Sequence, residues 1–155
     1  KYWALEVLLT YADGFTNKGN NYFVYFDPGP DKMYAIPWGV DKTFIPSSYQ
    51  LPPIYTKTAL PNRLYSLSQG RQMYFRALHT ILNEVWNEGT ILAEISRLEA
   101  QLTPVVVADP WYATAKDWDG NRADFATSLN LLRHFVQSRR SEIQIILLVG
   151  KIFWP

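Results

Sequence analysis

Apolar side chains open the sequence with helical spacing. Trp3 and Val7, together with Leu8 or Leu9, fall near one side of a helix, which predicts a helix over residues 2–12. The stretch YADGFTNKGNN at the end of that segment is dense in Asp, Gly, Asn and Thr, residues that favour loops. We therefore expect the first helix to run into a polar loop.

Two short apolar and aromatic runs follow this loop, at residues 22–26 and 33–38. The sequence DPGPD between them is turn-forming, so the two runs are predicted to pair as a β-hairpin. Pro37 has no N–H to give to a ladder, so we expect regular pairing to stop near it. Because the strands are so apolar, we expect them to be anchored in the core.

Helical spacing returns after residues 44–62, a proline-rich stretch that is predicted to be a loop. Three helices are expected, over residues 72–84, 88–102 and 124–148. Pro104 is expected to end the second of them, because proline breaks the interior of a helix. The pattern as a whole predicts a single domain over residues 1–155. Its fold class is α+β, mainly α, with a small β-hairpin followed by a helical bundle.

Composition and charge exclude several classes of function. The net charge is +1, which leaves no electrostatic footprint for nucleic acid or an acidic membrane surface. The chain has no cysteine, which excludes thiol catalysis, disulfides and thiolate zinc sites. The longest apolar run, residues 143–149, is too short to span a bilayer. The only histidines, His79 and His134, are expected to be packed or surface residues of helices, so a Ser-His-Asp triad has no support.

The sequence begins with KYWALEVLL, which already has the pattern of a secondary-structure element. The regions of a signal peptide are missing from it. We therefore expect the chain to be a piece of a longer protein whose beginning lies elsewhere.

Carboxylates and amides gather around the open end of the predicted hairpin. Asn20 and Asn21 lead into its first strand, and Asp41 follows its second. A hairpin brings these two points together, so Asn20 or Asn21 is expected to neighbour Asp41, with Asp13 one loop away. Such oxygen ligands suit magnesium, and an aspartate beside the metal suits phosphoryl transfer. The same residue types also form turns and caps, and Lys18 with the glycine after it is compatible with an anion-binding turn.

The segment ADGFTNKGNNYFVYFDPGPDKMYAIPWGVDKTF resembles the CotH kinase family, the spore-coat protein H type. Members commonly share an Asp-Gly-aromatic step, an Asn-Tyr entry to a strand, a Tyr-x-Asp-Pro turn and a Pro-Trp-x-x-Asp exit followed by Phe. Here these features occupy residues 13–15, 21–22, 25–28 and 37–44. The helical segments LPNRLYSLSQGRQMYFRALHTIL, ISRLEAQLTPVVVAD and LNLLRHFVQSRR resemble the family more loosely, so the likeness covers nearly the whole chain.

The resemblance implies the C-terminal lobe of an atypical protein kinase, which uses Mg²⁺ and ATP to phosphorylate Ser or Thr hydroxyls of a protein substrate. Asp41 would bind the metal, helped by Asn21. Asp13, Asn20 and Asn21 are the candidate catalytic residues, and Asp13 is our choice of base on chemical grounds. Lys18, Asn21 and Asp41 are the candidate contacts to ATP. The family also implies a place in the spore coat, the cell envelope or outside the cell.

Two departures from the family favour an alternative. Many members carry an acid two residues before the Asp41 position, where this chain has Gly39, so one potential metal ligand is gone. The half of a kinase that clamps the nucleotide would lie upstream of Lys1, so the chain by itself is expected to be nearly inactive. The alternative is a catalytically degenerate kinase-like module for surface attachment or protein binding, favoured by aromatics that look exposed: Tyr49, Tyr55, Trp111 and Tyr112. A magnesium-dependent hydrolase that uses the same carboxylates on water is a third alternative.

Overall fold

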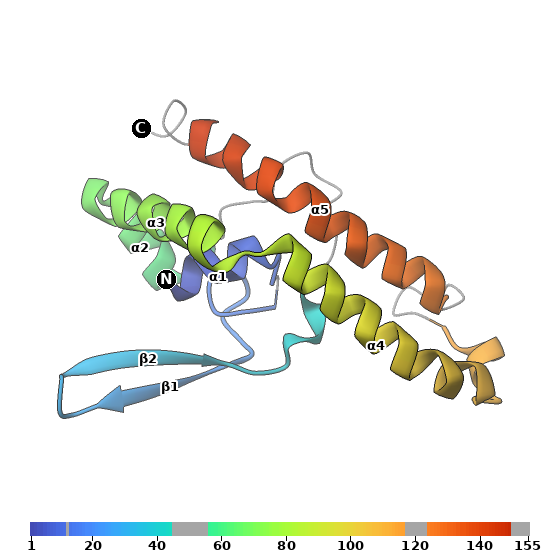
Figure 1. Cartoon of the computed structure of the whole chain (residues 1–155). Coiled ribbons are helices and arrows are strands. Elements are labelled where there is room, and N and C mark those ends of the chain that lie inside the picture. The colour runs from blue at the N-terminus through green and yellow to red at the C-terminus, as the bar shows by residue number, and fades with distance from the viewer. Residues whose placement is uncertain (12, 45–55, 117–123, 150–155) are drawn as a thin grey trace. The chain divides into compact units, whose positions relative to one another are not determined.

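A computed structural model of the chain describes residues 1–11, 13–44, 56–116 and 124–149. The protein is mainly α-helical with one antiparallel β-hairpin, which confirms the predicted fold class (Figure 1). The chain forms two compact units, one made of residues 1–86 with the segment from 139 onward and one made of residues 87–138. Each unit is described by itself below.

The first unit contains α1 (Tyr2–Leu8), α2 (Ala59–Ser66), α3 (Ser68–Thr80), a π-helical turn η2 (Ile81–Val85) and the last part of α5 (Phe125–Val149). α1 is shorter than predicted. Thr10 takes the left-handed conformation at φ 51°, and the N–H of Tyr11 turns back to the carbonyl of Glu6 at 2.8 Å. The core of this unit is apolar and aromatic, with Ala4, Val7, Leu8, Tyr11, Tyr65, Tyr74, Leu78, Ile81, Leu82, Trp86, Ile143 and Ile146 buried.

The predicted hairpin is present and pairs as the turn chemistry requires. β1 (Tyr22–Asp27) and β2 (Lys32–Pro37) pair from Tyr22 opposite Pro37 to Asp27 opposite Lys32. One further bond, from the N–H of Trp38 to the carbonyl of Asn21 at 3.1 Å, closes the open end. The expectation that pairing stops near Pro37 is therefore correct.

The expectation that both strands are anchored in the core is wrong. Phe23, Tyr25 and Trp38 are 60%, 53% and 55% exposed, and they lie on the outer face of the hairpin together with Tyr34 and Ile36. The inner face is also more than half exposed at Val24, Phe26 and Met33, and its contact with the rest of the unit includes the ring of Tyr22, which lies 4.8 Å from that of Phe15. A two-stranded sheet has two faces, and in the described part of the chain only the inner one is turned toward other elements.

The second unit contains α4 (Glu88–Ala108), the 3-10 turn η3 (Tyr112–Thr114) and the first part of α5. Asn87 caps α4, since its side-chain oxygen accepts the N–H of Thr90 at 2.9 Å. The prediction that Pro104 ends this helix is wrong, because the helix continues past it to Ala108. A proline inside a helix removes one backbone hydrogen bond and crowds the carbonyl four residues before it. The helix can continue where the backbone hydrogen bonds before and after the proline are kept.

Tyr112 is partly buried rather than exposed, and its hydroxyl accepts the N–H of Phe125, the first residue of α5, at 2.7 Å. Trp111 is 77% exposed, as expected. Tyr49 and Tyr55 lie outside the described residues. An ion pair between Arg133 and Glu99 joins α5 to α4 within this unit. Among the described helices, none combines the length and the apolar character needed to cross a membrane.

Candidate functional site

The C-terminal end of α1 is fixed by a buried arginine from the other end of the sequence. Arg139, fully buried in α5, donates from Nε to the carbonyl of Leu8 at 2.6 Å and from Nη2 to the carbonyl of Val7. Its remaining amino group bonds to Glu142 at 2.8 Å. The last carbonyls of a helix lack partners within the helix and carry partial negative charge, so a guanidinium is well matched to them. Arg139 thereby fixes the C-terminal end of α1 in position.

The polar loop after α1 is folded around the side chain of Glu6, which is 2% exposed. One carboxylate oxygen accepts the N–H of Phe15 at 2.8 Å. The other accepts the N–H of Thr16 at 2.8 Å and also the Thr16 hydroxyl. Gly14 permits this close approach, because a Cβ there would stand 2.3 Å from Glu6 Oε1. The loop that carries Asp13 is therefore attached to α1 by a buried carboxylate.

The segment that leaves the hairpin is attached at both ends to residues that directly follow α1. The hydroxyl of Tyr11 lies 2.6 Å from the carbonyl of Trp38, at the start of the segment. The N–H of Phe44, at its end, donates to the carbonyl of Leu9 at 2.8 Å. Between these points the 3-10 turn η1 (Val40–Lys42) presents Asp41 as an exposed side chain.

Asn21 and Gly39 face each other at the open end of the hairpin. Both adopt left-handed backbone conformations, at φ 54° and 63°. A Cβ on Gly39 would stand 3.3 Å from the amide nitrogen of Asn21 and 3.8 Å from its amide oxygen. Because Gly39 is also the residue that begins η1, the Asn21 amide lies beside the turn that carries Asp41.

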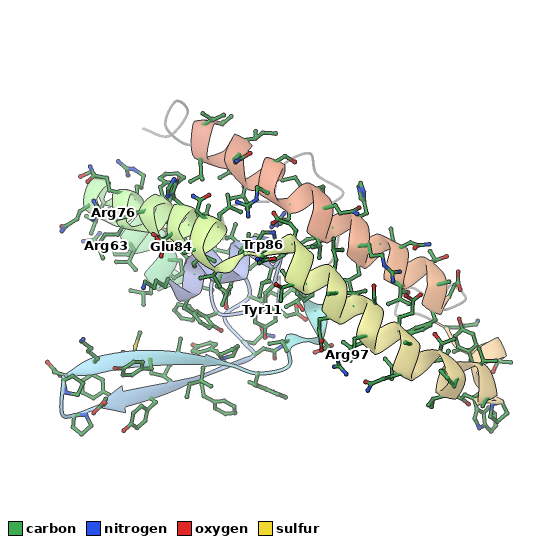
Figure 2. All side chains as sticks on the ribbon, in the orientation of Figure 1. Tyr11, Arg63, Arg76, Glu84, Trp86 and Arg97 are labelled. Atoms are coloured by element: carbon green, nitrogen blue, oxygen red, sulfur yellow. The ribbon has the colours of Figure 1, made fainter. Side chains whose placement is uncertain are left out.

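Tyr11 lies at the centre of this corner, where the chain enters and leaves the hairpin (Figure 2). Burial raises the pKa of the Tyr11 hydroxyl, hydrogen bonding by Asn21 lowers it, and the nearby charges of Glu6, Asp13 and Asp41 raise it. The same hydroxyl also lies 3.1 Å from the carbonyl of Asn21. The charges of both predicted carboxylates, Asp13 and Asp41, thus act on the same phenol.

The other predicted residues of the loop have plainer surroundings. Asp13 forms an ion pair with Lys18 at 2.9 Å, in which Lys18 is the more exposed partner. Asn20 is exposed, and within the described part of the chain its side chain makes no hydrogen bond. Both histidines are exposed, as expected for surface residues. The roles assigned to Asp13, Lys18, Asn20, Asn21 and Asp41 stay predictions.

The donor set of this corner fits magnesium bound together with phosphate better than a metal held by protein alone. The described residues contain no cluster of three or more His, Cys, Asp or Glu side chains that could hold a metal ion. Mg²⁺ is usually bound by one or two carboxylates with substrate phosphates and water completing its shell. Asp41 supplies an exposed carboxylate that makes no ion pair with a described residue, and Asn21 supplies an amide beside Gly39, two residues before Asp41.

Three residues that organise the site escaped the sequence analysis, namely Glu6, Tyr11 and Arg139. Glu6 had a signal, because it is the only acid within the apolar stretch YWALEVLL and a buried acid requires partners. Tyr11 had a weaker one, as an aromatic residue at the helix-to-loop boundary. Arg139 had none, because its partners are carbonyls more than a hundred positions away in the sequence.

Comparison with known families gives a match that covers most of the chain. The family model described as "CotH kinase protein" matches residues 1–143, which include the loop, the hairpin, η1 and the buried Arg139. Comparison with the curated proteins gives no match.

Proposed function

Because this chain belongs to the CotH kinase family, we propose that it transfers the γ-phosphoryl group of Mg-ATP to Ser or Thr hydroxyls of a protein substrate. The observation that carries the proposal is the arrangement around Tyr11. The loop with Asp13 is bonded to Glu6 of α1, and the residues just after α1 bond to Asn21 and to both ends of the segment that carries Asp41. Phosphoryl transfer depends mainly on such positioning and on neutralisation of charge.

Each residue has a distinct part in the proposed reaction. Asp41 and the Asn21 amide would hold magnesium, which neutralises charge on the phosphates when it is bound. Lys18, largely exposed beside Asp13, would contact phosphate oxygens. The acceptor oxygen forms its bond to the γ-phosphorus as the bond to the β-phosphate oxygen breaks, and the proton of the hydroxyl passes to Asp13. Asn20, exposed at the entry to β1, would help to position the acceptor.

The proposal is tested by calorimetry of Mg-ATP binding to the full-length protein and to its Asp41→Asn variant. Mutation of a residue that only supports a metal ligand typically weakens metal binding by about tenfold or more. Loss of the ligand itself should therefore weaken binding of Mg-ATP by at least about tenfold. Glu84→Gln is the matched control, because Glu84 is an exposed acid in the same unit and should leave binding unchanged. Binding that needs no magnesium, or that Asp41→Asn leaves intact, would show the assignment to be wrong.

A second function is favoured by two specific observations. Gly39 adopts a left-handed conformation where many family members carry an acid, and Asp13 is engaged by Lys18. In this second function the chain is a degenerate kinase-like module that binds a protein or attaches to a surface, and its aromatic outer hairpin face provides contact area. A magnesium-dependent rise in melting temperature with ATP present would argue against it. The absence of any such rise in the full-length protein would support it.

A further inference from the structure

A cavity of about 470 Å³ lies between the inner face of the hairpin and helices α1 and α3 of the first unit. This volume falls within the range of small-molecule sites. Its walls are mostly apolar and aromatic, with Trp3 from α1, Phe15 from the polar loop and Tyr74 from α3. The corner that carries Asp41 does not contribute to it, so the cavity is separate from the proposed phosphoryl-transfer site.

Both methionines of the chain line this cavity. Met33 projects from β2 and Met73 from α3, and they are the only two in the sequence. Methionine side chains are unbranched and polarizable, so they adapt to ligands of irregular or flexible shape. Their side chains are 52% and 63% exposed, which leaves a flexible apolar lining open to solvent.

The polar groups around the cavity favour an anion. Lys1 and Arg76 line it, no acidic residue does, and neither cation makes an ion pair with a described residue. Because the charged residues of the lining are both cations, an anionic ligand is favoured over a cationic one.

We propose that this cavity binds a free single-chain amphiphile with an anionic head, a fatty carboxylate. The chain would lie against the two methionines and the aromatic walls, and the carboxylate would pair with the guanidinium of Arg76. A guanidinium is suited to this role because it meets a carboxylate through two parallel hydrogen bonds. The site is independent of phosphoryl transfer and is tested without it.

The two methionines provide a direct test in the 155-residue chain. Protein labelled with ¹³C at the methionine methyl groups gives one signal each for Met33 and Met73, assigned by Met33→Leu and Met73→Leu; an added initiating methionine gives a third that serves as a reference. Titration with sodium dodecanoate below its micelle concentration should shift both signals in a saturable way with one dissociation constant. Dodecyltrimethylammonium, with the same chain and the opposite charge, should shift neither at those concentrations.

Substitutions separate the head group from the chain. Arg76→Gln should weaken dodecanoate binding about tenfold, the effect of losing one charge-assisted contact. Arg63→Gln is the control, because Arg63 is an exposed arginine of α2 that does not line the cavity. Met73→Glu, on an exposed position, should abolish binding by repulsion, and Ala77→Phe should do so by filling the space, with circular dichroism to verify the fold.

Three results of the titrations would overturn the proposal. They are a shift of only one methionine signal, equal binding of the cationic amphiphile, and an Arg76→Gln affinity equal to that of the control. A chain that adsorbs to anionic lipid vesicles while free dodecanoate leaves both methyl signals unmoved would also overturn it, since that result describes a surface rather than a cavity.

Discussion

Replacing Glu6 by glutamine exchanges one oxygen for an NH₂ group at the point where the polar loop joins α1. The carboxylate accepts three hydrogen bonds, from the N–H of Phe15 and from the N–H and hydroxyl of Thr16. A glutamine has one acceptor oxygen, so in either orientation its NH₂ group faces a backbone N–H. The substitution therefore breaks at least one bond and leaves its donor buried without a partner.

The magnitude follows from the burial of the site. A hydrogen bond to a charged group contributes about 1.5–3 kcal/mol, and an unsatisfied buried donor costs about 1–3 kcal/mol. These terms overlap, so we expect Glu6→Gln to lower the free energy of unfolding by about 2–4 kcal/mol. Against a typical total of about 5–15 kcal/mol this is a large fraction, and it should be plain in a urea titration followed by circular dichroism.

The reasoning has a matched control and a coupling test. Glu84→Gln, at an exposed position of the same unit, should change stability by less than about 0.5 kcal/mol. Thr16→Val removes the hydroxyl partner of Glu6, so the double variant should be less destabilised than the sum of the two single variants by about 0.5 kcal/mol or more. A Glu6→Gln variant as stable as the Glu84→Gln control would refute the role assigned to this carboxylate.

Four further outcomes are expected. Arg139→Lys keeps the charge but loses the fork that bonds two carbonyls of α1, so it should cost about 2–3 kcal/mol in urea unfolding, whereas exposed Arg97→Lys should not shift the midpoint. Gly70→Ala places a Cβ 1.8 Å from the carbonyl oxygen of Leu64, so the corner between α2 and α3 must move, and the melting temperature should fall in line with a loss of about 2 kcal/mol; an unchanged value would contradict the packing. Because burial raises the pKa of Tyr11 in the folded state, the native chain retains a proton that the unfolded chain loses above about pH 10, so stability should fall as the pH rises beyond that point, and Tyr11→Phe should make the fall shallower. If residues 1–155 are a single domain, thermal unfolding followed by far-UV circular dichroism and by tryptophan fluorescence should give one coincident transition, and two separate transitions would refute that prediction.

Local chemistry made part of the fold predictable. The turn sequence DPGPD lies between β1 and β2 as expected, and the long helical stripe of residues 124–148 lies within one residue of α5 at each end. Where the prediction failed, a residue's immediate neighbours did not determine its environment. Pro104 lies within a helix that continues past it to Ala108. The apolar strands are more than half exposed at residues of both faces, although their hydrophobicity favoured burial.

The site shows the same division. The neighbourhood of Asn21, Gly39 and Asp41 follows from pairing geometry, since a hairpin must bring its two ends together. The hydrogen bonds of Glu6 and Tyr11 depend on how the chain folds back toward α1 after the helix ends. The spacing of hydrophobic residues does not predict that path. Arg139 of α5 fixes the end of α1, and a contact between residues so far apart in the sequence cannot be predicted from a local pattern.

The bond from Arg139 to Leu8 spans 131 positions of sequence. During synthesis the ribosome must therefore add most of the chain before the end of α1 acquires its partner. Until then the loop and the hairpin can form only local contacts, because a closure of this length is slow and costly in entropy. The outer face of the hairpin is exposed in the folded chain as well as during this interval, so what the late contact with Arg139 completes is the end of α1.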